Sequence, residues 1–98
     1  MIGSFRDGES GALAFFYLDN VRNCDIPASI EKQLRRKLSL IDAATTEKSL
    51  FAAHNNNYER LAGTLQGWSS IRVSIQWRLI FRRRDGQAYD LYLHPNKF

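Results

Sequence analysis

The first half of the chain carries apolar residues at helical spacing. Between residues 27 and 41 they recur every three or four positions, at Ile30, Leu34, Leu38 and Ile41. This stripe predicts an amphipathic helix with one buried side, and Pro27 suits its first turn. Four basic residues lie mostly on the other faces, where we interpret them as the solvated side of the helix rather than as a phosphate-binding group: Lys32, Arg35, Arg36 and Lys37.

Shorter elements are predicted around this helix. Residues 10–20 favour a helix, because Ser10 is a suitable N-cap and an apolar stripe follows at Leu13, Phe16 and Tyr17. Residues 46–51 predict a third, short helix, and residues 2–6 predict a short strand. Residues 54–57 predict a loop, since they contain three asparagines and asparagine favours turns.

The pattern changes to a period of two from Tyr58 onward. Apolar residues occupy odd-numbered positions: Ile71, Val73, Ile75, Trp77, Leu79, Phe81, Tyr89, Leu91 and Leu93. Polar residues lie between them, and within residues 71–82 Ile80 alone breaks the alternation. Such alternation predicts antiparallel strands with one buried and one open face. The chain therefore predicts an α+β fold, with two to three N-terminal helices packed on one face of a three- to four-stranded antiparallel sheet.

The parity of two hairpin loops decides which side chains share a face, because opposed residues in an antiparallel pair point to the same side. A three-residue loop over residues 74–76 would oppose Arg72 to Arg78. A three-residue loop around residues 85–86 would likewise keep odd residues opposite odd ones. Odd loops in both places predict these side chains on the open face: Arg72, Arg78, Arg82, Tyr92 and His94. Tyr58 and Arg60 are predicted to join them from the preceding strand.

Length and composition indicate one small domain over residues 1–98. No apolar run approaches the roughly 20 residues that span a bilayer, and the N-terminus lacks the pattern of a signal peptide. Cys24 is the one cysteine, so no internal disulfide is expected, and no Cys/His cluster has zinc spacing. We therefore expect a cytoplasmic protein with no membrane partner, no metal and no other cofactor.

The net charge of +4 comes from the second half of the chain. Residues 1–50 hold seven basic and seven acidic residues, whereas residues 51–98 hold seven basic and three acidic ones. A basic half favours a polyanionic partner, with nucleic acid first and a membrane surface second. A merely well-solvated surface explains the charge about equally well.

The predicted open face carries groups that are able to cleave RNA. Arginines neutralise phosphate and the charge of a transition state, a histidine moves protons near neutral pH, and an aromatic ring stacks on an unpaired base. The ribose 2′-hydroxyl supplies the nucleophile, so no metal is required. One structural alternative remains open, in which Arg82 only pairs with Asp90 across the sheet. Trp68 and Trp77 are interpreted as core residues and not as platforms for base stacking. His54, outside the alternating strands, is interpreted as inert.

The C-terminal half of the chain resembles the HigB-type toxins of the RelE superfamily. The resemblance rests on four runs: Leu61-Ala62-Gly63, Gly67-Trp68-Ser69-Ser70-Ile71-Arg72-Val73, Gln76-Trp77-Arg78-Leu79-Ile80-Phe81 and Asp85-Gly86. Residues 40–45 resemble the end of the family's second helix, and residues 2–5 resemble its opening, so the similarity extends over nearly the whole chain.

The resemblance implies a compact RelE-like domain with the function of a growth-inhibiting toxin in a type II toxin–antitoxin pair. Such toxins cut mRNA, typically in the ribosomal decoding site, without a metal. The implied partner is a HigA-like helix-turn-helix antitoxin. The toxin would contact operator DNA only through its complex with that antitoxin, which represses the operon of the pair.

The resemblance also implies roles for single residues. Arg72 and Arg78 fall on the family's phosphate-binding and transition-state arginines. Three places depart from the family: Ala62 replaces a lysine, Glu59 or Arg60 replaces a histidine, and Pro95-Asn96-Lys97 replaces Asp-Tyr-His. The expected catalytic set is therefore Arg72 and Arg78 with His94 or Lys97 as the proton-transfer group, and the expected RNA contacts are Arg60, Arg82, Tyr92 and Tyr58.

Two other functions remain open at this stage. The altered C-terminal site is compatible with a degenerate RelE-fold module that binds RNA or an antitoxin without cleavage. The basic face is also compatible with a structural or regulatory subunit that docks an acidic peptide.

Overall fold

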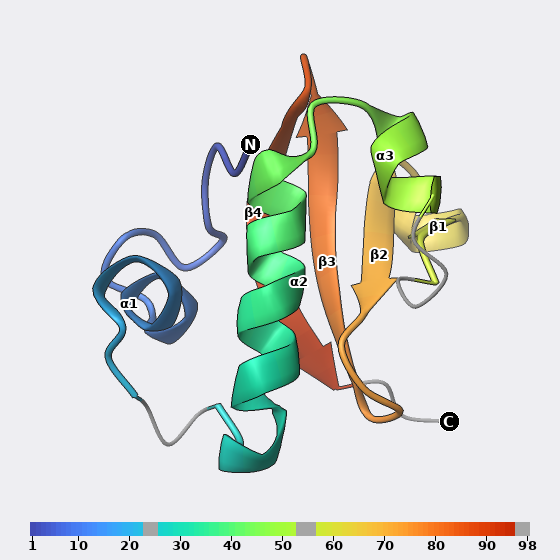
Figure 1. The fold of residues 1–98 in the computed structure, drawn as a ribbon. Coiled ribbons are helices and arrows are strands. Elements are labelled where there is room, and N and C mark those ends of the chain that lie inside the picture. Colours follow the sequence, from blue (N-terminus) through green and yellow to red (C-terminus); the bar gives the residue numbers. More distant parts are fainter. Residues whose placement is uncertain (23–25, 53–56, 96–98) are drawn as a thin grey trace.

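A computed structural model of the chain describes residues 1–22, 26–52 and 57–95. Three helices come first, α1 (Ala12–Asp19), α2 (Glu31–Ala43) and α3 (Glu47–Ala52). Four strands follow, β1 (Glu59–Arg60), β2 (Trp68–Arg72), β3 (Trp77–Arg84) and β4 (Gln87–Pro95). The predicted α+β fold is confirmed (Figure 1). The predictions made for Cys24, His54 and Lys97 concern positions outside the described residues.

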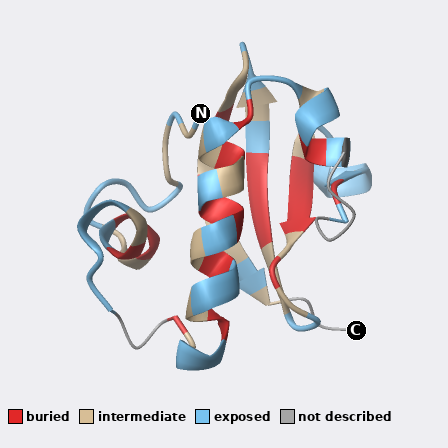
Figure 2. Ribbon diagram, in the orientation of Figure 1, coloured by how far each residue is buried: buried red, intermediate tan, exposed pale blue. Residues whose placement is uncertain are grey.

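Helix α2 covers the sheet and buries the predicted apolar stripe. It follows a 3-10 turn (Ala28–Ile30), and its stripe residues Leu34, Leu38 and Ile41 are at most 2% exposed. Figure 2 shows the stripe, and the middle of β2 and β3, as buried. Burying one such side chain contributes about 1.5–3 kcal/mol to folding. The helix therefore forms because it can place this stripe against the sheet.

Two basic residues of α2 depart from the predicted solvated side. Lys37 is buried, and burial, together with the neighbouring Arg36, lowers the pKa of its ammonium group. Arg35 turns back toward α1, where its guanidinium lies 4.3 Å from the centre of the Phe16 ring and donates to Asn20 Oδ1 at 2.6 Å. Only Lys32 and Arg36 of the four keep the exposed position expected of them.

The sheet is a four-stranded antiparallel meander in the order β1-β2-β3-β4. Its odd-numbered residues Ile71, Leu79 and Phe81 are fully buried in one cluster with the apolar residues of α1 and α2. The first hairpin has the predicted register, because Arg72 lies opposite Arg78. Its loop is closed where the amides of Val73 and Ser74 both donate to the carbonyl oxygen of Trp77. Even-numbered residues of β2 and β3 therefore face away from α2.

The second hairpin corrects the prediction of a three-residue loop. Asp85 and Gly86 form a two-residue turn with positive φ values of 52° and 79°, between the paired residues Arg84 and Gln87. Asn, Asp and Gly tolerate this backbone, which twists in the same sense as the strands. Tyr89 consequently lies opposite Arg82 on the open face and not in the core as expected, while Ala88 takes the buried position.

A β-bulge restores the predicted register further along the same hairpin. The register shifts between Ile80 and Arg82, and β4 accommodates the extra residue at Asp90, whose φ is 53°. Beyond the bulge Leu79 faces Leu93, and Arg78 faces His94. The additional residue that we predicted in the loop is therefore located within β4, at the bulge.

The N-terminal segment supports this bulge from the outer side of β4. Ile2 and Phe5 form isolated parallel bridges with Ala88 and Leu91, so the predicted strand over residues 2–6 is present only as two bridges. The amide of Asp90 donates to Ser4 Oγ at 2.9 Å, and the amide of Leu91 donates to Ser4 O at 3.2 Å. The N-terminal segment therefore provides hydrogen-bond acceptors for two backbone amides at the bulge.

A search of the described residues finds no helix that is both long and apolar enough to cross a membrane.

Candidate functional site

The face of the sheet directed away from α2, here called the open face, presents side chains in cross-strand rows. The first row contains Arg72, Arg78 and His94 from three successive strands. The second contains Ser70, Ile80 and Tyr92, with Glu59 added from β1, and the third contains Trp68, Arg82 and Tyr89. Directly opposed side chains in such rows have Cβ atoms about 4.5–5.5 Å apart. Three of the four predicted catalytic residues therefore share one row.

Arg78 is the largely enclosed member of that row, with 18% of its side chain exposed. Its Nη1 donates to Ser70 Oγ at 2.9 Å and to Glu59 Oε2 at 3.3 Å. Within the described part of the chain, the buried Nε atoms of Arg78 and Arg72 have no hydrogen-bond partner. A buried donor without an acceptor costs about 1–3 kcal/mol. These two atoms are also closed to solvent, so a ligand would reach them only if the guanidinium groups moved.

Cations and aromatic rings alternate beside this row. The guanidinium carbon of Arg6 lies 3.8 Å from the centre of the Tyr92 ring, and that of Arg82 lies 5.0 Å from the Trp68 ring. Trp68 and Tyr92 meet edge to face, with ring centroids 5.9 Å apart. Positive charge next to flat rings is the combination with which proteins bind single-stranded nucleic acids.

Trp68 corrects one prediction, and Arg82 resolves an open alternative. Trp68 is not a core residue; it is half-buried on the open face, whereas Trp77 packs against the core as expected. Arg82 pairs with Asp90 at 3.2 Å, with 55% and 40% of the two side chains exposed. An ion pair this exposed contributes little to stability, so Arg82 is held only loosely on the open face.

Ile80, which interrupts the alternation, has a structural reason to be apolar. It is 4% exposed although it lies on the open face, and its direct cross-strand neighbours are the fully buried Ser70 and the partly buried Tyr92. Ile80 and Ser70 therefore form a floor beneath the rings and arginines. A polar residue at position 80 would have to find a hydrogen-bond partner there.

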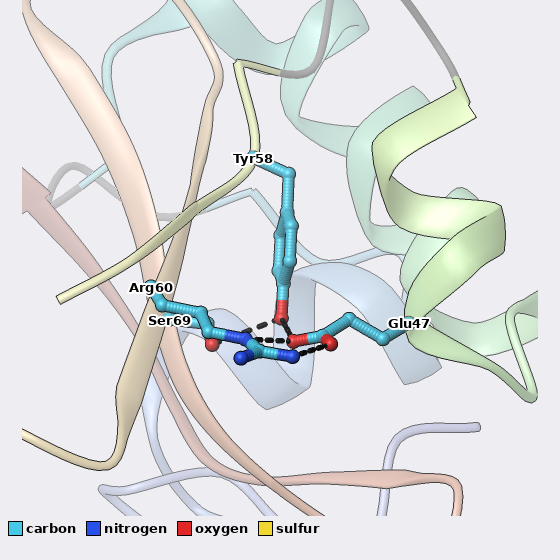
Figure 3. Close-up of polar contacts among 4 residues, drawn as sticks. All are labelled: Glu47, Tyr58, Arg60 and Ser69. Atoms are coloured by element: carbon cyan, nitrogen blue, oxygen red, sulfur yellow. Dashed lines mark hydrogen bonds and ion pairs between the residues drawn. The ribbon is translucent and has the colours of Figure 1, made fainter.

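Tyr58 and Arg60 do not lie on the open face, so their predicted placement is wrong. Arg60 pairs with Ser69, whose side chain points toward the helices, and Tyr58 is 7% exposed in the main core. Figure 3 shows both side chains converging on Glu47 of α3. The Tyr58 hydroxyl donates to Glu47 Oε2 at 2.8 Å and shares a hydrogen bond of 3.0 Å with Ser69 Oγ.

Arg60 completes this polar cluster with a two-pronged contact to Glu47. Its Nε donates to Glu47 Oε2 at 2.7 Å, and its Nη2 forms an ion pair with Glu47 Oε1. Hydrogen bonds from Arg60 and Tyr58 lower the pKa of Glu47 to about 2. Burial raises the pKa of the Tyr58 phenol, and its bond to the Glu47 carboxylate raises it further. The cluster joins α3 to β1 and β2 and leaves neither predicted RNA contact available on the open face.

Sequence reasoning missed four residues of the open face: Arg6, Glu59, Trp68 and Ser70. The even number of Trp68 and Ser70 already matched that of Arg72, so their placement was available from parity. Arg6 reaches Tyr92 only because the N-terminal segment runs beside β4, which no periodic pattern indicates. Across residues 1–22, 26–52 and 57–95, no three or more His, Cys, Asp or Glu side chains are grouped as metal ligands.

Comparison with known proteins gives a consistent set of similarities. A family model described as the RelE-like toxin of the type II toxin–antitoxin system HigB matches residues 4–96. Toxin HigB-1 of Vibrio cholerae serotype O1 is 49% identical over 83 residues, which are 85% of this chain and 87% of that protein. An uncharacterized protein of Haemophilus influenzae is 32% identical over 83 residues, 85% of this chain and 82% of that protein.

Proposed function

The chain belongs to the HigB-like toxins, the RelE-like toxins of type II toxin–antitoxin systems, and on this premise we propose that it is a metal-independent endoribonuclease that cuts mRNA on the ribosome. Membership of such a system implies an antitoxin as its partner. We propose further that this antitoxin is a HigA-like helix-turn-helix protein, and that operator DNA is bound only through the complex. An mRNA target on ribosomes would require the toxin to act in the cytoplasm.

The observation that supports cleavage most strongly is the row of Arg72, Arg78 and His94 across three strands. In the proposed reaction the 2′-hydroxyl of a ribose loses its proton and its oxygen attacks the adjacent phosphorus. The bond from phosphorus to the 5′-oxygen then breaks, and that oxygen takes a proton. The products are a 2′,3′-cyclic phosphate and a free 5′-hydroxyl, so water and redox partners are not consumed in this step.

Each member of the row has a distinct part in this reaction. Arg72 and Arg78 carry permanent positive charge, which suits the oxygens of a phosphate that gains negative charge in the transition state. His94 is exposed beside them and would transfer the proton. Lys97, outside the described residues, is the alternative proton-transfer group. The rigid strand backbone would hold these groups in place before the substrate arrives.

The aromatic part of the open face would position the RNA. Tyr92 and Trp68 offer ring surface beside the phosphate-binding row, and Arg82 would contribute charge once it leaves Asp90. Base stacking on such rings contributes about 1–3 kcal/mol per base and tolerates every base. Affinity would then come from stacking and charge, with little selection among sequences.

One observation favours the second candidate function, a module that binds RNA or an antitoxin without cleaving. Relatives carry a histidine near Glu59 and Arg60, and here both side chains are engaged in ion pairs, with Arg78 and with Glu47. Neither is therefore a free proton-transfer group. The two functions share the same open face and differ only in whether RNA is cut.

Substitution of the two arginines tests the proposed function. Arg72→Ala and Arg78→Ala should each relieve growth inhibition and weaken RNA binding by roughly 1.5–3 kcal/mol, the worth of a hydrogen bond to a charged group. Circular dichroism and thermal unfolding would establish that each variant is folded. If both folded variants arrest growth as the unaltered toxin does, the open face is not the site of action.

A further inference from the structure

Glu59 is an acidic side chain on a face that otherwise presents cations and rings. It lies opposite Ser70 at the β1 edge of the sheet, and its Oε2 lies 3.3 Å from Nη1 of Arg78. More than half of its side chain, 55%, is exposed. The Glu59 carboxylate is therefore paired with the same guanidinium group that binds RNA phosphate in the proposed function.

The backbone of Glu59 is held from the opposite side of its strand. Successive side chains of a strand point to opposite faces, so Arg60 faces α3 while Glu59 faces Arg78. Arg60 and Tyr58 bind Glu47 through the cluster of Figure 3. This anchorage keeps the Glu59 backbone in place, and its exposed carboxylate pairs with Arg78 on the open face.

The contact between Glu59 and Arg78 is weak enough for an anion to replace it. Charge-assisted hydrogen bonds are usually 2.7–2.9 Å long and often bidentate, whereas this one is single and 3.3 Å long. A phosphate carries several oxygens, so it can accept from the Arg78 guanidinium in the bidentate geometry that this single contact lacks.

We propose that Glu59 holds the place of an RNA phosphate on Arg78 in the free toxin and leaves it when RNA binds. This inference rests on the proposed function, because it requires Arg78 to bind RNA phosphate. Glu59 acts through Arg78 and is a positioning residue, not a catalytic one. Its effect is to make each binding event break one ion pair before Arg78 is available, which lowers affinity for RNA without altering the chemical step.

The substitution Glu59→Gln tests the proposal by removing the competing charge while keeping the shape of the side chain. RNA affinity should rise about two- to fivefold, the range expected for an exposed ion pair that no longer has to be broken. The slope of log K against log salt should stay the same, because Arg78 contacts the same phosphate in both proteins and the slope follows the number of phosphates contacted. In cleavage assays KM should fall while kcat is retained.

The probe is a single-stranded RNA of mixed sequence with 2′-O-methyl groups, which binds without being cut. Glu31→Gln is the control for net charge. It removes the same charge from the first residue of α2, whose side chain is 18% exposed and pairs with the exposed Arg22 away from the open face. Glu31→Gln should leave both the affinity and the salt slope unchanged. The affinity gain of Glu59→Gln should also disappear when Arg78 is replaced by Ala in the same chain.

Four results would overturn the inference. An equal gain in affinity for Glu59→Gln and Glu31→Gln would mean that only net charge matters. A loss of kcat in Glu59→Gln with unchanged affinity would make Glu59 a proton-transfer group instead. If the unaltered toxin binds the RNA and Arg78→Ala weakens binding, but Glu59→Gln has no effect, the inference alone fails. If Arg78→Ala does not weaken binding, the proposed function fails with it.

Discussion

Replacing Tyr58 with Phe removes one hydroxyl from the cluster that joins α3 to the sheet. The ring stays in the core, where it meets Phe51 edge to face with centroids 4.6 Å apart. The lost hydroxyl leaves Glu47 with one hydrogen-bond donor fewer and leaves the buried Ser69 without a bond of 3.0 Å. The substitution therefore isolates the structural role that replaces the predicted RNA contact.

The expected loss of stability follows from the two contacts. A hydrogen bond to a charged group contributes about 1.5–3 kcal/mol, and the bond from Tyr58 to the Glu47 carboxylate is short at 2.8 Å. In a domain of this size each kcal/mol lowers Tm by roughly 4–8 °C. RNA affinity should not change, because the phenol lies on the helix side of the sheet.

Thermal and urea unfolding, followed by circular dichroism, would measure this loss. Tyr89→Phe is the matched control, because the Tyr89 hydroxyl donates to a neutral acceptor, Gln87 Oε1, at 2.7 Å. Its removal should lower the free energy of unfolding by only about 1 kcal/mol. A Tyr58→Phe variant with unaltered Tm and weakened RNA binding would refute the structural assignment. It would restore Tyr58 as an RNA contact.

Three further predictions concern the acid stability, the bulge and the proton-transfer residue. The pKa of Glu47 falls from 4.5 to about 2 on folding, so the contribution of its carboxylate to stability is present above pH 4.5 and is lost as the pH drops toward 2. Glu47→Gln should therefore flatten the pH dependence of the urea midpoint between pH 4.5 and about 2. An unaltered profile would show that the Glu47 carboxylate does not cause this pH dependence. Asp90→Val should cost about 1–2 kcal/mol in urea unfolding because its φ is 53°, whereas Asp90→Gly should cost less; equal midpoints would contradict the bulge. His94→Gln should slow cleavage by roughly 10²–10⁴-fold with antitoxin binding retained; normal cleavage by His94→Gln together with an inactive Lys97→Met would transfer the role to the lysine.

The sequence predicted those parts of the fold in which a strong periodicity and burial agree. The stripe from Ile30 to Ile41 is buried, since a helix with that pattern has one side suited to a sheet. The first hairpin has the predicted parity because no residue is inserted between the loop and the paired arginines. The row of Arg72, Arg78 and His94 follows from these registers.

The remaining features depend on contacts between residues far apart in the sequence, which the alternation of polar and apolar residues does not indicate. The Asp85-Gly86 turn has the even length typical of its residues, and the compensating bulge at Asp90 depends on Ser4 from the other end of the chain. The face of Arg60 was set by a two-residue strand and by Glu47 on α3. The local sequence pattern indicates neither Ser4 nor Glu47 as a partner. The odd and even positions of β2 therefore could not predict which face Arg60 takes on the other side of residues 61–67.

The most direct test of the central claim maps the 5′ ends of cellular mRNA after induced expression of the toxin. The account predicts new ends inside translated regions for the unaltered toxin, and their loss when ribosome binding of the mRNA is blocked or the antitoxin is expressed with it. Arg78→Ala, produced to the same level and folded, should generate no new ends. Growth arrest without new mRNA ends would contradict cleavage and would favour the module that binds without cutting.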